Sequence, residues 1–597
     1  MASKTADQSD RVPRTGVPGE LLVRRSDPVY NGHSYLTKVP VSAVMPFIDA
    51  FTDPGDTVMD PFAGSGMTGV AAAMLGRRAI LSDISVLGQH VGRNYTNLVD
   101  RDAFLHASDL AIAATTARLC EEPYRARCRS CHREARLIRT VWTVELQCPG
   151  CADRINFYGA LEASGWSKRD LSCPRCETPI STRDAKRIGE APVVETILCL
   201  CSANQLHQPP SIETGLSPGS CGLDYPRVSV GPDREMFSRS ALAKHGLTEV
   251  ASFFSPRNLA VLAALRQAIE QQRDRDLSEK LRFAFTAILA RASKRYQWSR
   301  QRPLNASNQT YYIAPVFYEW NVLDLFSRKA QAIARSDAFI RAEIKRHCAP
   351  PPDVRYERAS ATDLGEFVAD SSVDYVFTDP PFGSNIFYSD MNLFAEAWLD
   401  AQTDVTQEAV VHTTKQKRAK AAARYEQLLR DAFAECRRAL KPDGWLTVVF
   451  SSTDGRMWAL LARALRAAGF AIEHGHITLL DKGQRSVKGL ASGVEGVVTC
   501  DVVLSMPKQE LDEMPEPLAP SQPLGETLME VLKAEDESLL VNVSRFYVST
   551  VRAYLRNGWR LDELSFARVV DELELLGFHR EAKSGRFTRA EQLELAS

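Results

Sequence analysis

Two short segments carry residues whose types and spacing suit chemistry on a bound ligand. The first, Asp60-Pro-Phe-Ala-Gly-Ser-Gly66, ends a short apolar run. Gly64 and Gly66 let the backbone approach a ligand where a Cβ atom would collide. The second, Asp379-Pro-Pro-Phe382, follows the apolar run VDYVF. Because proline fixes φ and has no N–H, Pro380 and Pro381 form a rigid turn that presents the Asp379 carboxylate and a backbone carbonyl.

The elements around these segments predict that both turns lie at the carboxyl ends of parallel strands. A strand at 56–60, a helix at 66–76 and a second strand at 78–83 make a β-turn-α-β unit of a parallel α/β sheet. The α/β pattern resumes near residue 354, with a strand before Asp379 and another at 445–450. Ligands of such sheets bind at the carboxyl edge. We therefore expect the two turns to face one cleft.

Neither segment is specific alone, because GSGMTG also fits a dinucleotide-binding turn. Together they resemble the hallmark loops of the DNA amino-methyltransferases, which make N6-methyladenine or N4-methylcytosine. The family's Phe-x-Gly-x-Gly and Asp-Pro-Pro-Phe loops match residue by residue, and His33 to Pro40 is similar to the family's motif X, which closes over the methionine part of the cofactor. Asp83 and Asp363 match its motif II and III positions.

This resemblance covers residues 30–100 and 354–505. It implies a Rossmann-like class I sheet and S-adenosylmethionine as the cofactor. The residues expected to bind the cofactor are Lys38, Pro40, Asp60, Pro61, Phe62, Ala63, Gly64, Ser65, Gly66, Asp83 and Asp363.

The expected catalytic residues are Asp379, Pro380, Pro381 and Phe382. Asp379 and the Pro380 carbonyl would accept hydrogen bonds from the exocyclic amine of a flipped-out base, and Phe382 would stack on it. The first-position Asp favours N6 of adenine, with N4 of cytosine as the alternative. Methylation at carbon 5 of cytosine needs a cysteine nucleophile, usually in a Pro-Cys dipeptide, and no cysteine here follows a proline.

Ten of the thirteen cysteines lie between Cys120 and Cys221, mostly in CxxC pairs, which favours metal over disulfides in a reducing compartment. The spacing predicts one structural Zn²⁺ held by Cys128, Cys131, Cys148 and Cys151. A second is expected at Cys173, Cys176, Cys199 and Cys201, where His207 or Cys221 could replace one ligand. Four thiolates leave no open position for catalysis. The insert either contacts DNA or a partner, or is a scaffold.

A third segment mixes basic and aromatic side chains, as in surfaces that bind phosphates and stack bases. Its members are Arg291, Lys294, Arg295, Tyr296, Trp298, Arg300 and Arg302. The alternative is a solvated helix end whose aromatic rings belong to the core. The net charge of −1 gives no overall basic field, so contacts with DNA must come from such local patches.

The 597 residues are expected to form several units, because one core rarely serves so long a chain. The predicted organisation is a disordered leader (1–20), a first methyltransferase part (21–119), a zinc-binding insertion (120–225), a helical insertion with possible target recognition (226–350), a second methyltransferase part (351–505), a linker (506–525) and a C-terminal helical domain (526–597). No apolar stretch reaches the roughly 18 residues of a membrane span, and the N-terminus has no secretory signal, so a cytoplasmic protein is expected.

Three functions remain open. The first is a DNA adenine-N6 methyltransferase, in a restriction-modification or phage-defence setting. The second is an RNA base methyltransferase of the tRNA guanine-N2 type, because Gly383 follows the catalytic motif. The third is a non-catalytic, zinc-dependent DNA-binding subunit. The C-terminal helices could bind protein partners.

Overall fold

The computed structural model describes residues 16–23, 27–36, 38–181, 185–211, 215–238, 240, 242, 245–300, 304–305, 311–347, 351–383, 387–410, 415–481, 498, 500–510, 514–535, 543–580 and 587–589. For 304–305, 415–420, 535 and 588–589 it describes the backbone alone. Of the predicted leader, residues 1–15 lie outside the described residues.

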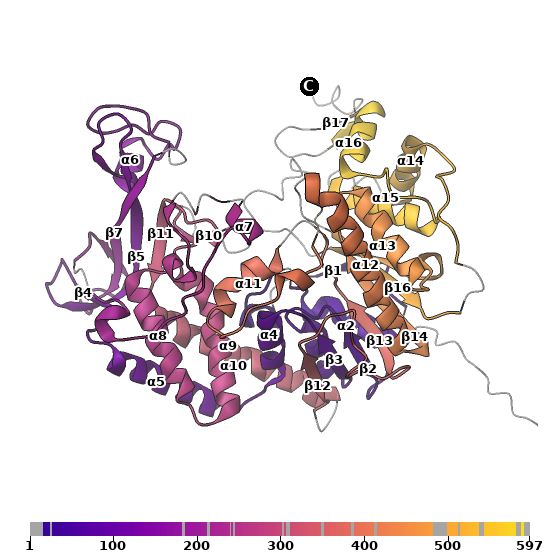
Figure 1. The fold of residues 1–597 in the computed structure, drawn as a ribbon, viewed down its shortest axis with the longest axis horizontal. Coiled ribbons are helices and arrows are strands. Elements are labelled where there is room, and N and C mark those ends of the chain that lie inside the picture. The colour runs from indigo at the N-terminus through magenta and orange to yellow at the C-terminus, as the bar shows by residue number, and fades with distance from the viewer. Residues whose placement is uncertain are drawn as a thin grey trace, which may run out of the picture.

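An eight-stranded sheet lies at the centre of the larger lobe (Figure 1). Its order is β1 (Glu20–Leu22), β15 (His476–Asp481), β16 (Cys500–Pro507), β14 (Leu440–Phe450), β13 (Val373–Thr378), β2 (Thr57–Asp60), β3 (Arg78–Ser82) and β12 (Val354–Glu357). β16 is antiparallel to both of its neighbours, and the other pairs are parallel. The predicted parallel strands and the terminal antiparallel hairpin are therefore confirmed.

The chain direction across the sheet reverses between β2 and β13. From β2 the chain adds β3 and β12 on one side, and from β13 it adds β14 on the other. Every residue of β2 and β13 is buried, as expected for parallel strands covered on both faces. Such a reversal point opens a crevice at the carboxyl ends of the two central strands.

Helices cover both faces of this sheet. They are α1 (Pro28–Gly32), α2 (Val41–Phe51), α3 (Met67–Met74), α4 (Val86–Thr96), α11 (Tyr388–Glu396), α12 (Lys415–Ala439) and α13 (Gly455–Ala467). α3 begins at Gly66, whose φ of +75° lies in the left-handed region. A Cβ at Gly66 would lie 2.7 Å from the Gly92 Cα atom, so this glycine permits close packing of α3 on α4.

The inserted chain forms a second unit around another eight-stranded sheet, whose strands are antiparallel. The sheet contains β4 (Arg125–Arg127), β5 (Glu134–Gln147), β6 (Arg154–Asn156), β7 (Arg187–Leu198), β8 (Leu206–Gln208), β9 (Tyr296–Gln297), β10 (Leu304–Asn305) and β11 (Val316–Trp320). β11 pairs with β5, so the cysteine-rich and helical insertions share one sheet. In Figure 1, β5, β7 and α6 (Phe157–Ala163) form an arm that extends away from the rest of the unit.

The helical layer of this unit is longer than expected. It contains α5 (Arg101–Arg118), α7 (Glu235–Ser238), α8 (Pro256–Glu270), α9 (Arg275–Ala292) and α10 (Val322–His347). α5, from the segment predicted as the first methyltransferase part, packs against α8, α9 and α10 and so belongs to this layer. A buried ion pair of 2.9 Å between Lys280 and Asp337 joins α9 to α10.

The C-terminal residues form α14 (Leu524–Glu535), α15 (Val543–Arg556), α16 (Phe566–Leu575) and a hairpin of β17 (Phe578–Arg580) and β18 (Phe587–Arg589). This unit is docked on the sheet domain: the Phe566 amide donates to the Thr453 carbonyl at 3.0 Å. The predicted linker is partly docked too, because Leu518 bridges to Trp559. Among the described helices, none has the length and apolar character to cross a membrane.

Candidate active site

The glycine turn and the double-proline turn lie at the same edge of the sheet. β2 and β13 are parallel neighbours in which Val58 pairs with Tyr375 and Met59 with Val376, so both strands end side by side. One cavity at this edge is lined by residues of both turns, although more than three hundred positions separate them. The predicted site residues that line it are Lys38, Asp60, Pro61, Phe62, Ala63, Gly64, Ser65, Asp83, Asp379 and Pro381.

Asp60 joins the two turns directly. Its Oδ1 accepts hydrogen bonds from the Thr378 hydroxyl at 2.9 Å and the Phe62 amide at 3.1 Å, and its Oδ2 accepts from the Thr68 hydroxyl at 2.6 Å. The side chain is buried, and this burial raises the pKa of Asp60 to about 7 despite the three donors. Because Thr378 immediately precedes Asp379, Asp60 positions the double-proline turn as well as the glycine turn.

Asp83 shapes the glycine turn from the next strand. Its two oxygens accept from the Gly64 amide at 2.8 Å and the Ser85 amide at 2.9 Å, which leaves lone pairs for a ligand. Burial raises the pKa of Asp83, and the backbone donors oppose this effect. Gly64 has a φ of +48°, and a Cβ there would lie 3.1 Å from the Tyr35 ring. The turn therefore requires glycine at this position.

The Lys38 ammonium points into the protein rather than towards a ligand. It donates to the carbonyls of Val29 at 2.9 Å, Tyr30 at 3.0 Å and His33 at 3.3 Å, and to the Tyr95 hydroxyl at 2.7 Å. Burial lowers the pKa of Lys38 to about 7. Its hydrogen bonds hold the predicted motif X segment on α4, and only its stem is left to line the cavity.

The double-proline turn is held from α12. The Tyr425 hydroxyl, on a fully buried side chain, donates to the Pro381 carbonyl. The Phe382 ring does not line the cavity: it packs edge-on against Phe450, with the ring centroids 5.1 Å apart. In this arrangement Phe382 braces the turn against Phe450 and is not among the residues that line the cavity.

Four other predicted residues also lie off the cavity wall. Pro40 precedes α2, Gly66 packs on α4, Pro380 is buried in the turn, and Asp363 lines a neighbouring shallow cavity. Residues that the sequence interpretation missed do line the cavity: Tyr35, Ser85, Ser360, Thr362, Tyr388, Ser389, Asn392 and Glu408. Tyr388 to Asn392 follow the double-proline motif by a few positions, and that proximity was the available indication.

Eight cysteines form two four-cysteine clusters, but the predicted grouping is wrong. The clusters are Cys128, Cys131, Cys199 and Cys201, and Cys148, Cys151, Cys173 and Cys176, each with its sulfur atoms within 4.8 Å of one another. The reason is β5: its 14 residues span roughly 46 Å and separate the first two CxxC pairs. The antiparallel strand β7 then brings the later pairs back to opposite ends of β5.

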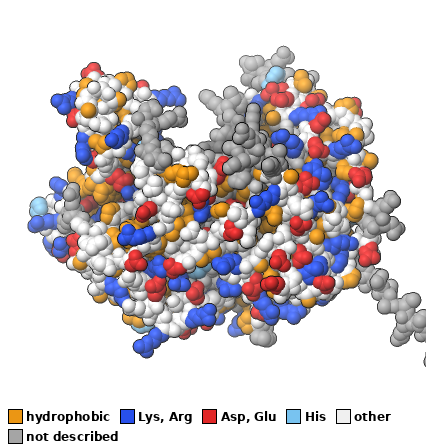
Figure 2. Space-filling model, viewed as in Figure 1, with side chains coloured by type: hydrophobic (Ala, Val, Ile, Leu, Met, Phe, Trp, Pro, Cys, Tyr) orange, Lys and Arg blue, Asp and Glu red, His pale blue; other side chains and the backbone are white. Residues whose placement is uncertain are grey.

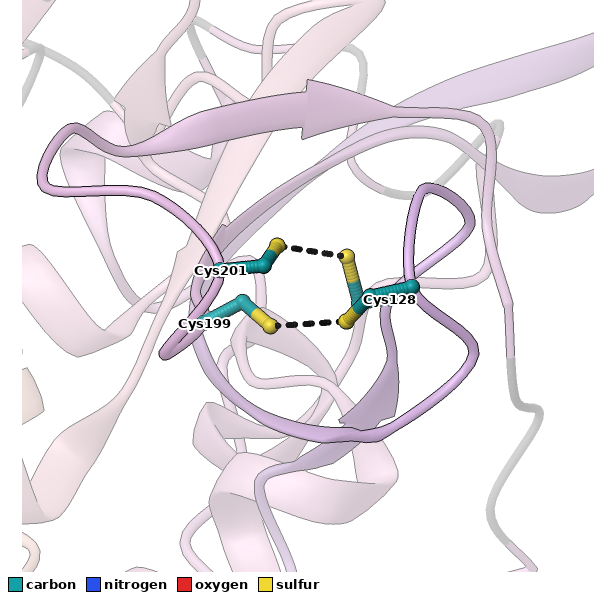
Figure 3. A group of neighbouring side chains, drawn as sticks. Cys128, Cys199 and Cys201 are labelled. Carbon is teal, nitrogen blue, oxygen red and sulfur yellow. Dashed lines mark hydrogen bonds between the residues drawn. The ribbon is translucent and has the colours of Figure 1, made fainter.

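The sulfur spacing in both clusters suits a tetrahedral metal. Closest approaches are 3.6 Å for Cys128 to Cys201 and 3.4 Å for Cys131 to Cys199 (Figure 3). In the other cluster they are 3.5 Å for Cys148 to Cys176 and 3.8 Å for Cys151 to Cys173. Four thiolates around Zn²⁺ at about 2.3 Å stand about 3.8 Å apart, so both clusters fit structural zinc.

Of the ten cysteines between Cys120 and Cys221, the first and the last depart from the expectation of metal over disulfides. Cys120 and Cys221 form a disulfide at the base of the insertion, so Cys221 is not a metal ligand. His207 belongs to neither four-cysteine cluster, and its Nδ1 contacts the Thr196 hydroxyl at 3.0 Å.

The basic and aromatic segment divides into an inward and an outward part. Arg295 is only 2% exposed, with its guanidinium 4.2 Å from the centre of the Phe394 ring, and Tyr296 is also buried. Lys294 pairs with Glu190 at 2.7 Å. Trp298 lies 5.3 Å from the arm residue Trp166, whose ring is covered by Arg300 at 5.1 Å. Arg291 is exposed at the end of α9, and Arg302 lies outside the described residues.

Comparison with known proteins bears on the N-terminal part of this site. Residues 9–86 match the N6/N4 family described as DNA methylase. "Putative methylase YubD" of Escherichia coli (strain K12) is 50% identical over 52 residues, which are 8% of this chain and 23% of that relative. The chain thus spans about a quarter of that relative's length. The resemblance to the DNA amino-methyltransferases is therefore confirmed by a family match over residues 9–86, the segment that contains the glycine turn.

Proposed function

We propose that this protein is a DNA methyltransferase that transfers a methyl group from S-adenosylmethionine to an exocyclic amino group, with N6 of adenine as the target. The observation that carries this proposal is the single cavity lined by the glycine turn and the Asp379 turn. It lies where the direction of the sheet reverses, and the strand order is compatible with a Rossmann-like class I domain. The family match supports the glycine turn, and the role of the Asp379 turn is part of the proposal.

The residues of the glycine turn fit the cofactor. A left-handed Gly64 keeps the floor of the cavity free of a side chain, and Asp83 retains lone pairs for a ribose diol. Apolar walls come from Val44, Phe62 and Phe377. When bound, S-adenosylmethionine supplies an electrophilic methyl group on a sulfonium.

The Asp379 turn would act on the amine of the target base. An aromatic amine is a weak nucleophile because its lone pair is delocalised into the ring. Hydrogen bonds from its N–H groups to the Asp379 carboxylate and the Pro380 carbonyl would shift the nitrogen towards sp³ and aim the lone pair at the methyl group. The base must leave the duplex to reach this position. Since Phe382 packs on Phe450, we assign the contact with the base to Tyr388, which lines the cavity.

The inserted unit would bind the DNA around the target base. Zinc in the two four-cysteine clusters would stabilise an arm that has only a narrow two-stranded core. We assign phosphate contacts to Arg291 and Arg300, which are exposed, and leave Arg295 and Tyr296 to the interior. Acidic and basic side chains alternate over the visible face in Figure 2, so these contacts must be local.

The test is methyl transfer by purified protein onto duplex DNA and onto tRNA, with the methylated nucleosides identified by mass spectrometry. We expect N6-methyldeoxyadenosine from DNA. Asp379→Asn should lower kcat by about 10²- to 10³-fold, because it removes one charged acceptor from the reacting nitrogen. The exposed α5 variant Asp109→Asn is the matched control. N4-methyldeoxycytidine would replace the base assignment, and transfer to tRNA alone would refute a DNA enzyme.

A further inference from the structure

A second cavity, of about 630 Å3, adjoins the one that holds the reacting groups. It lies between residues 30–36 and helices α9, α10 and α11, and Tyr35, Leu36, Lys38 and Asn392 line both cavities. Figure 1 shows these helices between the large sheet and the cysteine-rich arm. The second cavity is therefore next to the place where a flipped base would sit.

The charged groups of this cavity are all of one sign. Apart from the stem of Lys38, whose ammonium is held by backbone carbonyls and Tyr95, its charged lining residues are Arg291, Arg295, Arg328 and Lys329, with no Asp or Glu among the described residues. Burial lowers the pKa of Lys329 to about 8, and the like charge of Arg291 adds to this effect. The electrostatic potential inside the cavity is therefore positive.

Two of these guanidinium groups converge on one ring at the outer end of the cavity. The Arg291 and Arg328 guanidinium carbons lie 5.6 Å and 5.8 Å from the centre of the Trp320 ring, and both side chains are exposed. Arg139 lies 4.9 Å from the same centre. The repulsion among these three guanidinium groups costs free energy. Their cation–π contacts with the Trp320 ring offset this cost only in part, and a bound anion would offset more of it.

Behind them, Lys329 is oriented by the C-terminal end of α1. Its ammonium donates to the Asn31 carbonyl at 3.2 Å and the Gly32 carbonyl at 3.1 Å. An ammonium has three protons, so one remains for a ligand. Arg328 and Lys329 lie outside the basic segment of Arg291 to Arg302, because α10 begins twenty residues after Arg302. Only folding places them beside Arg291.

We propose that this cavity binds a phosphate group through Arg291, Arg328 and Lys329. Guanidinium groups bind phosphate oxygens in a bidentate manner, and an ammonium adds a point charge. The phosphate can come from substrate DNA, as the phosphodiester that flanks the flipped nucleotide, or from a free nucleotide. The DNA source rests on the function proposed above, and the free source does not.

The test measures binding of a labelled DNA duplex at several salt concentrations for Arg291→Gln/Arg328→Gln. Each lost phosphate contact lowers the magnitude of the slope of log K against log salt by about 0.9. Because both guanidinium groups hold the same phosphate, the double variant should lose close to one in slope and bind about tenfold more weakly at moderate salt. Affinity for S-adenosylmethionine should not change, because neither arginine lines the cavity of the glycine turn. Lys329→Met should show a smaller loss in the same direction.

The matched control is Arg275→Gln/Arg335→Gln, which removes the same charge from exposed positions of α9 and α10 outside the cavity lining. Pyrophosphate binding by calorimetry tests the free source, and methyl transfer by the wild type onto the same duplex tests the proposed function separately. One outcome is that Arg291→Gln/Arg328→Gln loses pyrophosphate binding while its slope of log K for DNA against log salt stays that of the wild type. This outcome assigns the site to a free nucleotide. If that variant matches its control in both DNA slope and pyrophosphate affinity, the phosphate site is refuted.

Discussion

The hydrogen bond between Thr378 and Asp60 is the most direct link between the two halves of the site. Thr378→Val removes the hydroxyl and keeps the shape of a fully buried side chain. Oδ1 of Asp60 keeps only the Phe62 amide, at 3.1 Å, as a donor. The variant therefore tests whether this one contact holds the double-proline turn against the glycine turn.

The expected loss depends on pH, because burial raises the pKa of Asp60 to about 7. At pH 8 the carboxylate is ionised, and a hydrogen bond to a charged group contributes about 1.5–3 kcal/mol. At pH 6 most of the carboxyl is protonated, and the same bond contributes about 1 kcal/mol. We expect Thr378→Val to lower the local stability of β13 by about 2 kcal/mol at pH 8 and by roughly half of that at pH 6.

Native-state hydrogen exchange of peptides from β2 and β13, followed by mass spectrometry, measures this local free energy without assuming two-state unfolding. The control is Thr550→Val in α15, another fully buried threonine, whose hydroxyl donates to the Phe546 carbonyl at 3.0 Å. That carbonyl belongs to the helix four residues earlier, so its loss should have little effect. Equal changes in the two variants, or a Thr378→Val effect of the same size at both pH values, would refute the reasoning.

Three further predictions concern the same framework. The pKa of Asp60 is about 7 in the folded state and about 3.9 in the unfolded chain, so the folded state binds more protons between these pH values. The stability of the wild type relative to Asp60→Asn should therefore fall as the pH rises from about 4 to 7. Thermal unfolding of both proteins measures this, and a difference in unfolding temperature that stays constant with pH would contradict the prediction. Cys173→Ser/Cys199→Ser should release no zinc when the purified protein is denatured, because the two residues belong to different clusters and both sites lose a ligand. Release of one zinc per chain would instead support the grouping predicted from the sequence, in which Cys173 and Cys199 share one site. Tyr425→Phe should lower kcat about tenfold and leave the KM for the cofactor unchanged, because the Pro381 carbonyl loses its hydrogen-bond donor. Steady-state kinetics measures both constants, and a rise in KM without a fall in kcat would contradict the prediction.

Local patterns in the sequence were enough for much of the sheet domain. The apolar runs before Asp60 and Asp379 predicted the two central strands, because a parallel strand must be buried on both faces. The Gly-rich and Pro-rich turns that follow them predicted where a ligand meets the sheet, since glycine and proline restrict which backbone conformations are possible. The resemblance of these turns to the methyltransferase loops added the cofactor.

Contacts between distant segments could not be obtained in the same way. Cysteine spacing alone grouped neighbouring pairs, whereas the length of β5 places Cys128 and Cys148 at opposite ends of the arm. Phe382 was expected to face a base, and its packing on Phe450 turns it towards the core. Arg295 was expected on a surface and is buried against Phe394. In each case the sequence determined which chemical groups are present, and tertiary packing decided their direction and their partners. The physical reason is that a buried side chain packs against segments that are distant in the sequence, and a local sequence pattern contains no information about those segments.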